Sequence, residues 1–216
     1  VVRGGVLESA TSLVSEHSGE IESAFIRPSA PPLTDEPIDD ITNFPLPLYP
    51  YQRVGARFAR VRKGSLIADE MGLGKSRQSL AACALEERVL IISPAVVTSH
   101  WRNEAAIGLE CEPVVLHGTK PQFIDPNTRV VVVNYDIFPK HAENLKAWKP
   151  TAVILDEVHM VKNPKALRTK ALLNFIKVLN PKVVALSGTP MMNRPVELIP
   201  VLQLTDSFKT VGKDWM

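Results

Sequence analysis

The sequence has only two cysteines, has no long apolar run and shows no apolar leader at its beginning. Cys83 and Cys111 are too few for a disulfide framework or a zinc knuckle, which favours a reducing, intracellular setting. Proline and charged residues interrupt every apolar stretch before it reaches the ~18 residues that a membrane span needs. The first residues, Val-Val-Arg-Gly-Gly, do not resemble the apolar core of a signal peptide. These absences argue against membrane, secreted and zinc-finger proteins.

The composition that remains is ordinary for a globular chain, but the charge is unevenly distributed. Apolar residues make up 45% and charged residues 22% of the chain. Its 216 residues are enough for one α/β domain and too few for two full-sized ones. The first 50 residues carry eight acids and two bases, so the remainder has a net charge of +8. A surplus of this size is compatible with a polyanionic partner, and a need for solubility explains it equally well.

Residues 1–47 are predicted to be an acidic, proline-rich extension of a lobe that spans residues 48–216. Seven prolines lie between Pro28 and Pro50, a density that interrupts both helix and sheet. Residues 28–47 are therefore predicted to form a linker or an extended strap. Residues 1–27 fit either the tail of an upstream domain or a flexible segment.

From Tyr51 onward, short apolar runs alternate with stretches of helical periodicity. Several runs are rich in β-branched residues and are apolar at both odd and even positions, as is typical of strands buried on two faces. The predicted strands are 65–68, 89–93, 113–116, 129–134, 152–156 and 183–187, and the predicted helices are 76–87, 96–107, 136–148 and 165–179. This alternation predicts an α/β fold, in which a parallel β-sheet is flanked by helices on both faces.

The first chemical signal is a phosphate-binding loop (P-loop, or Walker A motif) between a predicted strand and a predicted helix. Two glycines in this loop permit positive φ angles and bring backbone N–H groups close to an anion, while the helix adds its N-terminal partial charge. Lys75 supplies a positive charge for the β and γ phosphates of ATP, and the Ser76 hydroxyl can ligate Mg²⁺. A chance glycine-rich turn is the alternative, and Asp69 replaces the usual leading glycine. The predicted nucleotide-binding residues of this segment are Met71, Gly72, Leu73, Gly74, Lys75, Ser76 and Arg77.

The second signal is the sequence Asp-Glu-Val-His at 156–159, which follows an apolar predicted strand. The carboxyl end of a parallel sheet is where ligands bind, and the phosphate loop is predicted to lie at the same edge. Asp156 is therefore expected to hold Mg²⁺ through its water shell, and Glu157 to polarise the attacking water as a general base. The alternative is a carboxylate pair that caps the next turn.

Taken in order, these segments resemble the N-terminal RecA-like lobe of the Swi/Snf-type, superfamily-two helicase-like ATPases. The resemblance covers about residues 46–205, and Asp156–His159 corresponds to the DExH box, with valine where alanine is usual. Further matching motifs are Leu90–Pro94 with Trp101 and Glu104, Val133–Asp136, Lys162-Asn163, Arg168–Lys170 and Ser187–Arg194. The run Asn193–Leu198 resembles the corresponding segment in the branch that contains annealing helicases and fork-remodelling translocases, and in phage or bacterial relatives.

The resemblance implies ATP-driven translocation on double-stranded DNA, with Lys75 and Glu157 as the catalytic residues. It assigns Gln52 to the adenine edge, where an amide can both donate and accept hydrogen bonds. It implies that His159, Ser187 and Thr189 couple the nucleotide state to DNA. The implied nucleic-acid contacts are Trp101, Arg102, Asn134, Tyr135, Lys162, Arg168 and Lys170. Trp101 also falls at helical spacing with Val96 and Val97, so a core position is an alternative for this residue.

The resemblance further implies a second RecA-like lobe, whose arginine neutralises charge on the γ-phosphoryl group during hydrolysis. The chain stops shortly after the third motif, so this lobe is expected either in a longer chain or in trans. Two other functions stay open at this point, namely an RNA or general helicase lobe and a nucleotide-gated nucleic-acid-binding module without turnover. A small-molecule kinase would share the phosphate loop but would not account for the later motifs.

Overall fold

Six strands pair in the order β1-β6-β5-β2-β4-β3 in the computed structural model, which describes residues 41, 44–189 and 195–206. The strands are β1 (Gly64–Ile67), β2 (Val89–Ser93), β3 (Val114–Val115), β4 (Val130–Asn134), β5 (Ala152–Leu155) and β6 (Lys182–Leu186). Every pairing is parallel. The parallel α/β sheet predicted from the alternation of strands and helices is confirmed.

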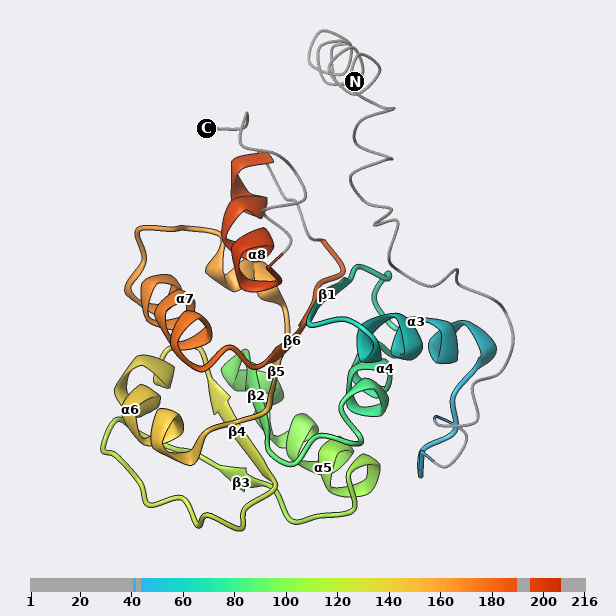
Figure 1. The fold of residues 1–216 in the computed structure, drawn as a ribbon, viewed down its shortest axis with the longest axis horizontal. Coiled ribbons are helices and arrows are strands. Elements are labelled where there is room, and N and C mark those ends of the chain that lie inside the picture. Colours follow the sequence, from blue (N-terminus) through green and yellow to red (C-terminus); the bar gives the residue numbers. More distant parts are fainter. Residues whose placement is uncertain (1–40, 42–43, 190–194, 207–216) are drawn as a thin grey trace, which may run out of the picture. The chain divides into compact units, whose positions relative to one another are not determined.

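Helices lie against both faces of the sheet (Figure 1). The α-helices are α3 (Pro50–Arg60), α4 (Lys75–Ala82), α5 (Thr98–Gly108), α6 (Phe138–Trp148), α7 (Leu167–Leu179) and α8 (Ile199–Leu204). Short 3-10 helices follow at η1 (Ala95–Val97), η2 (Val158–Val161) and η3 (Pro195–Leu198). Among the helices that the structure describes, none combines the length and apolar character that crossing a bilayer requires.

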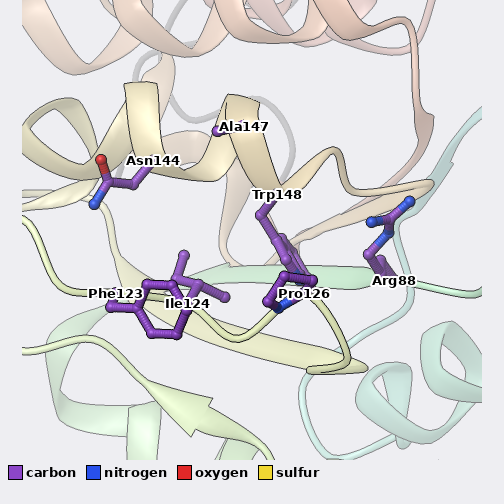
Figure 2. Close-up of a pocket in the computed structure, with 7 residues that line it drawn as sticks. All are labelled: Arg88, Phe123, Ile124, Pro126, Asn144, Ala147 and Trp148. Carbon is purple, nitrogen blue, oxygen red and sulfur yellow. The ribbon is translucent and has the colours of Figure 1, made fainter.

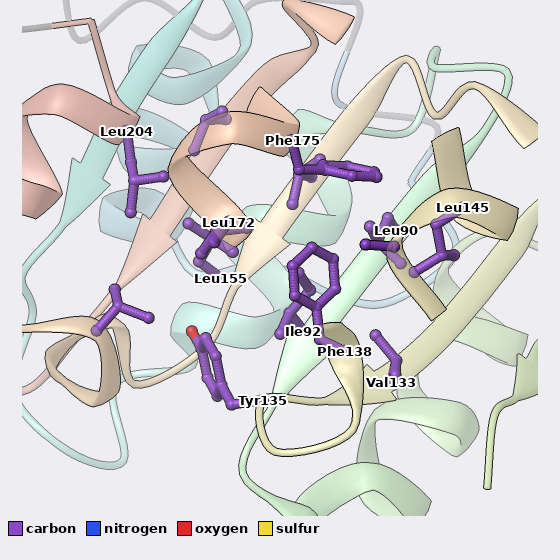
Figure 3. Close-up of a cluster of buried hydrophobic side chains, with 14 of the residues drawn as sticks. Leu90, Ile92, Val133, Tyr135, Phe138, Leu145, Leu155, Leu172, Phe175 and Leu204 are labelled. Carbon is purple, nitrogen blue, oxygen red and sulfur yellow. The ribbon is translucent and has the colours of Figure 1, made fainter. Parts of the chain in front are cut away.

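The strands carry apolar residues on both faces because each face meets a different core. One core contains Leu90, Ile92 and side chains of α6, α7 and α8 such as Phe138, Phe175 and Leu204 (Figure 3). The other contains Val89, Ile91 and side chains of α4 and α5. Alternate residues of one strand therefore point into opposite cores, as a doubly covered sheet requires.

Several element boundaries differ from the sequence-based prediction. Strand β3 has only two residues, and α4 ends at Ala82 rather than Glu87 because the amide of Cys83 closes the helix onto the carbonyls of Ser79 and Leu80. Helices α3 and α8 are absent from the predicted helices. The buried side of α3 consists of Gln52, Ala56 and Ala59, which are too polar or too small to give an apolar period.

The end of the predicted proline-rich segment packs onto the lobe. Ile41 is buried and forms a small cluster with Ala56 and Ala81, against which Phe44 also packs. A Cβ atom on Gly108 would lie 3.0 Å from the Phe44 ring, so this chain segment also touches α5. The described residues 41 and 44–46 therefore include positions that contact the lobe. Residues 1–40 lie outside the described residues, so the acidic extension stays a prediction.

Candidate nucleotide site

The strand order brings three predicted motifs to one edge of the sheet. Strand β6 lies between β1 and β5, so the segments that leave their carboxyl ends are neighbours. A Cβ atom built on Gly188, after β6, would lie 3.7 Å from the Lys75 Nζ atom and 3.2 Å from Met71 Cγ. The charge of Lys75 also acts on the carboxyl group of Asp156, after β5. The structure therefore places the phosphate loop, the Ser-Gly-Thr turn and the acidic pair around one site.

The phosphate loop has the backbone conformation that its glycines permit. Gly72 has a φ of +83° and Gly74 a φ of +72°, and Gly74 caps the start of α4. Lys75 folds back over the loop, where its Nζ atom donates to the carbonyls of Asp69 at 2.8 Å and Glu70 at 2.9 Å. An ammonium group has three donors, so Lys75 can bind a phosphate oxygen with its third donor or by exchanging one of these bonds.

Two glutamines from neighbouring helices support the loop. Gln52 on α3 donates to the Leu73 carbonyl at 3.1 Å, and Gln78 on α4 donates to the Asp69 carboxylate at 2.7 Å. Asp69, which replaces the glycine expected at this position, therefore ties the beginning of the loop to α4. Sequence reasoning missed Gln78, although its position one turn after Gly74, whose carbonyl accepts the Gln78 amide at 3.2 Å, places it next to the loop.

Gln52 is almost fully buried, and both ends of its amide are engaged within the protein. Its Oε1 atom accepts from the Tyr49 amide at 2.9 Å, while its Nε2 atom bonds to the loop. Reading an adenine edge would require Gln52 to exchange one of these contacts. The exposed rings of Tyr49 and Tyr51 stack next to it, with centroids 5.9 Å apart and planes 5° from parallel.

Two buried aromatic side chains hold Asp156 at the end of β5. The Trp101 indole on α5 donates to the Asp156 Oδ2 atom at 2.7 Å, and the Tyr135 hydroxyl donates to the main-chain oxygen of Asp156 at 2.8 Å. Burial raises the pKa of the Asp156 carboxyl, while the Trp101 bond, the Glu157 amide and the Lys75 charge oppose that rise. A carboxylate removed from solvent in this way is suited to a cation that restores its lost solvation.

Glu157 occupies a strained turn immediately after Asp156. Its φ is +48°, which is unusual for a residue with a side chain and is a known feature of functional positions. Its Oε2 atom lies 3.1 Å from the Nδ1 atom of His159, and both side chains are about a quarter exposed. The predicted base and the predicted coupling histidine therefore touch each other.

The residues around this edge fit a Mg²⁺ site that is shared with nucleotide phosphates. Mg²⁺ in such sites is held by one or two protein oxygens, by waters and by the phosphates themselves. Asp156 supplies a partly desolvated carboxylate, and Ser76 follows Lys75 in the first turn of α4. Within the described ranges there is no cluster of three or more His, Cys, Asp or Glu side chains that could hold a metal by protein ligands alone.

The Ser187 hydroxyl of the Ser-Gly-Thr turn is hydrogen-bonded within the turn itself. Ser187 is fully buried, and its Oγ atom accepts from the Thr189 amide at 3.2 Å. The Ser187 amide donates to the Ile67 carbonyl at 3.2 Å, which links this turn to the strand before the phosphate loop. Thr189 is exposed. The turn therefore touches the loop through its backbone, and the following residues 190–194 lie outside the described part of the chain.

The predicted nucleic-acid contacts divide into buried rings and accessible polar side chains. Trp101 and Tyr135 are 0% and 2% exposed, so they have no surface for a nucleic acid and instead support Asp156. Three cations lie against carboxylates: Arg102 against Glu112, Lys162 against Glu197 at 3.8 Å and Arg168 against Asp136 at 3.1 Å. Asn134 caps the backbone amides of residues 136 and 137, and Lys170 is exposed.

Arg77, predicted to bind the nucleotide, instead faces α5. Its Nε atom lies 3.4 Å from the Glu104 carboxylate. Met71 and Leu73 extend from the loop with 75% and 38% exposure, which leaves both accessible to a ligand or a partner.

A cavity of about 330 Å³ lies away from this edge (Figure 2). It is lined by Arg88, Phe123, Ile124, Pro126, Asn144, Ala147 and Trp148. Arg88 immediately precedes β2, and Trp148 is the last residue of α6, so the cavity is at the amino-terminal side of the strands. None of the predicted site residues lines it.

Comparisons with known proteins show the family to which this chain is similar. The profile of the SNF2-related domain matches residues 51–210. A Caenorhabditis elegans homologue of SWI/SNF-related matrix-associated actin-dependent regulator of chromatin subfamily A-like protein 1 is 35% identical over 74% of this chain and 24% of its own length. Mouse DNA annealing helicase and endonuclease ZRANB3 is 36% identical over 70% of this chain and 15% of its own length.

The fold matches a solved structure as well. The Sulfolobus solfataricus SWI2/SNF2 ATPase core in complex with dsDNA superposes with a TM-score of 0.67 at 23% identity. This match covers 80% of the present chain and 38% of the other, which shows the shared fold. The chain thus spans less than half the length of each of these relatives.

Proposed function

This chain belongs to the SNF2-related domain family of helicase-like ATPases, and we propose that it is the ATP-binding RecA-like lobe of a DNA-dependent translocase. The proposal rests above all on one observation, the convergence of Lys75, Gly188 and Asp156 at the carboxyl edge of the sheet. The similarity to ZRANB3 and to the subfamily A-like protein supports the branch of annealing helicases and fork remodellers. Action on DNA implies an intracellular location.

The residues of this lobe have distinct parts in ATP hydrolysis. Lys75 binds the β and γ phosphates, and the amides of the phosphate loop at the start of α4 orient them. When bound, Mg²⁺ would neutralise phosphate charge, and Ser76 and Asp156 are the residues that would hold it. Glu157 accepts a proton from the attacking water. The water oxygen forms a bond to the γ phosphorus, and the bond between the γ phosphorus and the bridging oxygen, which leaves with ADP, breaks.

We assign the arginine that neutralises charge in the transition state to a second lobe. Negative charge accumulates on the transferred group, and an arginine that neutralises it contributes roughly 10³–10⁵ in rate in related sites. The chain spans only 24% of the length of its C. elegans relative, which is compatible with such a lobe elsewhere in a longer protein or in trans. The 216-residue chain is therefore expected to bind Mg-ATP and to hydrolyse it very slowly.

The proposed DNA surface consists of the accessible members of the predicted set. Arg102, Lys162, Arg168 and Lys170 would bind phosphates without regard to sequence, and Asn134 would add a polar contact. Because each phosphate contact releases counterions, binding is expected to be weak and to fall steeply with salt. A comparison of duplex DNA with duplex RNA as competitors separates translocation on DNA from an RNA helicase lobe.

The test measures nucleotide binding and turnover by the same chain. A fluorescent ATP analogue is titrated into the parent, Lys75→Ala and, as a matched control, Lys177→Ala on the exposed side of α7. We expect only Lys75→Ala to lose affinity, and we expect phosphate release to stay slow with and without duplex DNA. Equal binding by the parent and Lys75→Ala would refute the site. Robust DNA-stimulated turnover by the purified chain would refute the assignment of the transition-state arginine to a second lobe.

A further inference from the structure

The indole of Trp101 joins helix α5 to the acidic end of β5. The ring is fully buried, and its N–H donates to the Asp156 Oδ2 atom at 2.7 Å. This distance lies at the short end of the range of about 2.7–3.2 Å for N–H···O bonds, as charge-assisted bonds do. The indole N–H is the only polar group of a tryptophan side chain. Trp101 therefore uses its whole hydrogen-bonding capacity on the carboxylate that is expected to hold the metal.

Asp156 is anchored from a second side through its main chain. Tyr135 follows β4, and its hydroxyl donates to the Asp156 carbonyl at 2.8 Å. Tyr135 therefore fixes the backbone, and Trp101 fixes the rotation of the carboxylate relative to that backbone. A carboxylate offers about four lone-pair directions, so one bond to Trp101 leaves others for the water shell of a cation.

We propose that Trp101 is a positioning residue for the Mg²⁺ site, because its N–H holds the Asp156 carboxylate in the orientation that receives the cation. This inference rests on the proposed nucleotide function. It assigns a role in metal binding to a residue whose motif predicted contact with nucleic acid. Partners that orient a ligating group typically change metal affinity by about 10- to 100-fold when they are removed.

The molecule contains a matched control for this role. Trp148 at the end of α6 is 4% exposed, and its indole N–H donates to the Thr128 carbonyl at 3.1 Å. It lines the cavity at the amino-terminal side of the strands, whereas the predicted nucleotide site is at their carboxyl edge (Figure 2). Replacing either tryptophan by phenylalanine removes one indole donor and reduces the buried ring by the same number of atoms. A difference between the two variants therefore reports the partner of the N–H.

The experiment measures how binding of a fluorescent ATP analogue depends on Mg²⁺ in the parent, Trp101→Phe and Trp148→Phe. We expect Trp101→Phe to need about tenfold more Mg²⁺ for half-maximal enhancement of binding. Its affinity for the analogue in EDTA is expected to equal that of the parent, because the phosphate loop is intact. Trp148→Phe is expected to keep the parental Mg²⁺ dependence.

If Trp101→Phe does not fold, 3-benzothienylalanine at position 101 keeps the bicyclic shape and replaces the N–H by sulfur. The same rise in the Mg²⁺ requirement is expected for that variant. An unchanged Mg²⁺ dependence in either folded variant would overturn the positioning role. Failure of the proposed function is seen separately, as a parent chain whose analogue binding responds neither to Mg²⁺ nor to Lys75→Ala, and this result would overturn the inference as well.

Discussion

The two halves of the nucleotide site are supported by different kinds of contact. The phosphate loop is held by polar side chains that bond to its backbone, namely those of Lys75 and Gln52. The acidic end of β5 is held by Trp101 and Tyr135, whose rings are buried in the two cores of the sheet. One half can exchange its contacts with a ligand, whereas the other is fixed by packing.

This difference matches what each half has to do. A loop that binds phosphates must give up internal hydrogen bonds when the ligand arrives, and the bonds of Lys75 to two carbonyls are of this kind. Groups that hold a metal or accept a proton act best when they are already oriented, because the transition state then requires little reorganisation. The comparison predicts that changes in the loop alter nucleotide affinity directly, and that changes in the acidic half alter turnover or the Mg²⁺ dependence of binding.

The largest effect is expected for Glu157→Gln. This substitution keeps the size of the side chain and its hydrogen-bonding ability but removes the base, so turnover is expected to fall by at least about 10²-fold. Nucleotide affinity is expected to stay within about twofold of the parent, because the substitution leaves Lys75 and the phosphate loop unchanged. The measurement is steady-state phosphate release by an assembly that contains a second lobe, combined with a binding titration. Parental turnover in this variant would remove Glu157 from the role of base.

Lys75→Ala is expected to show the opposite pattern. Removal of the charge at the β and γ phosphates is expected to weaken Mg-ATP binding at least tenfold, or about 1.4 kcal/mol. The domain is expected to stay folded, because the carbonyls of Asp69 and Glu70 lie at the surface of the loop, where water can replace the lost bonds. The binding titration is combined with urea unfolding. A loss of stability without a loss of affinity would contradict the comparison.

The polar support of the loop can be tested with a pair of glycine substitutions. Both Gly72 and Gly74 have positive φ, but an added Cβ meets nothing within 4 Å at Gly72 and lies 2.2 Å from the Gln52 Nε2 atom at Gly74. Gly72→Ala is expected to lower the free energy of unfolding by about 1–2 kcal/mol through backbone strain alone. Gly74→Ala is expected to cost about 1 kcal/mol more, because Gln52 must leave the Leu73 carbonyl.

A double-mutant cycle identifies the source of that additional loss. If Gln52 is the obstacle, Gly74→Ala combined with Gln52→Ala costs less than the sum of the single substitutions. Urea unfolding of the four proteins gives the coupling energy. Strict additivity would show that Gly74 is required for its backbone conformation alone.

Local patterns in the sequence were sufficient for the parallel sheet and for the position of the glycine-rich loop between β1 and α4. Apolar residues on both faces of the strands predicted burial on both sides of the sheet, whereas binding of phosphate by the Gly-Lys-Ser segment stays a prediction. Helix α3 was not predicted from periodicity because its buried face is Gln52, Ala56 and Ala59. Its contact with the loop follows from tertiary packing, which no window of sequence contains.

The partner of Trp101 illustrates the same limit within the site. Trp101 and Asp156 are far apart in the chain and meet because β2, which leads to α5, pairs with β5. Helical spacing indicated a core position for Trp101 as an alternative, but it did not indicate that the indole N–H would meet Asp156. The pairing of strands had to be known before this hydrogen bond was evident.

The smallest expected effect concerns the connection between the acidic half and DNA. Asp136 follows Tyr135 and lies 3.1 Å from the guanidinium of Arg168, with 70% and 35% of their side chains exposed. Because exposed pairs contribute little, Asp136→Asn is expected to change the free energy of unfolding by less than about 0.5 kcal/mol. It frees Arg168 for a phosphate, so affinity for duplex DNA at low salt is expected to rise about two- to threefold.

Glu143→Gln supplies the matched control for this last prediction. It removes the same charge from a similar exposed pair, with Lys146 at 2.8 Å, whose lysine is not a predicted DNA contact. Both variants raise the net charge by one, so any general attraction to DNA rises equally in the two. A larger gain in Asp136→Asn, lost again in Asp136→Asn combined with Arg168→Ala, would assign the effect to Arg168. Equal gains in the two single variants would instead mean that Arg168 does not bind DNA. The acidic half of the site would then have no connection to DNA through this arginine.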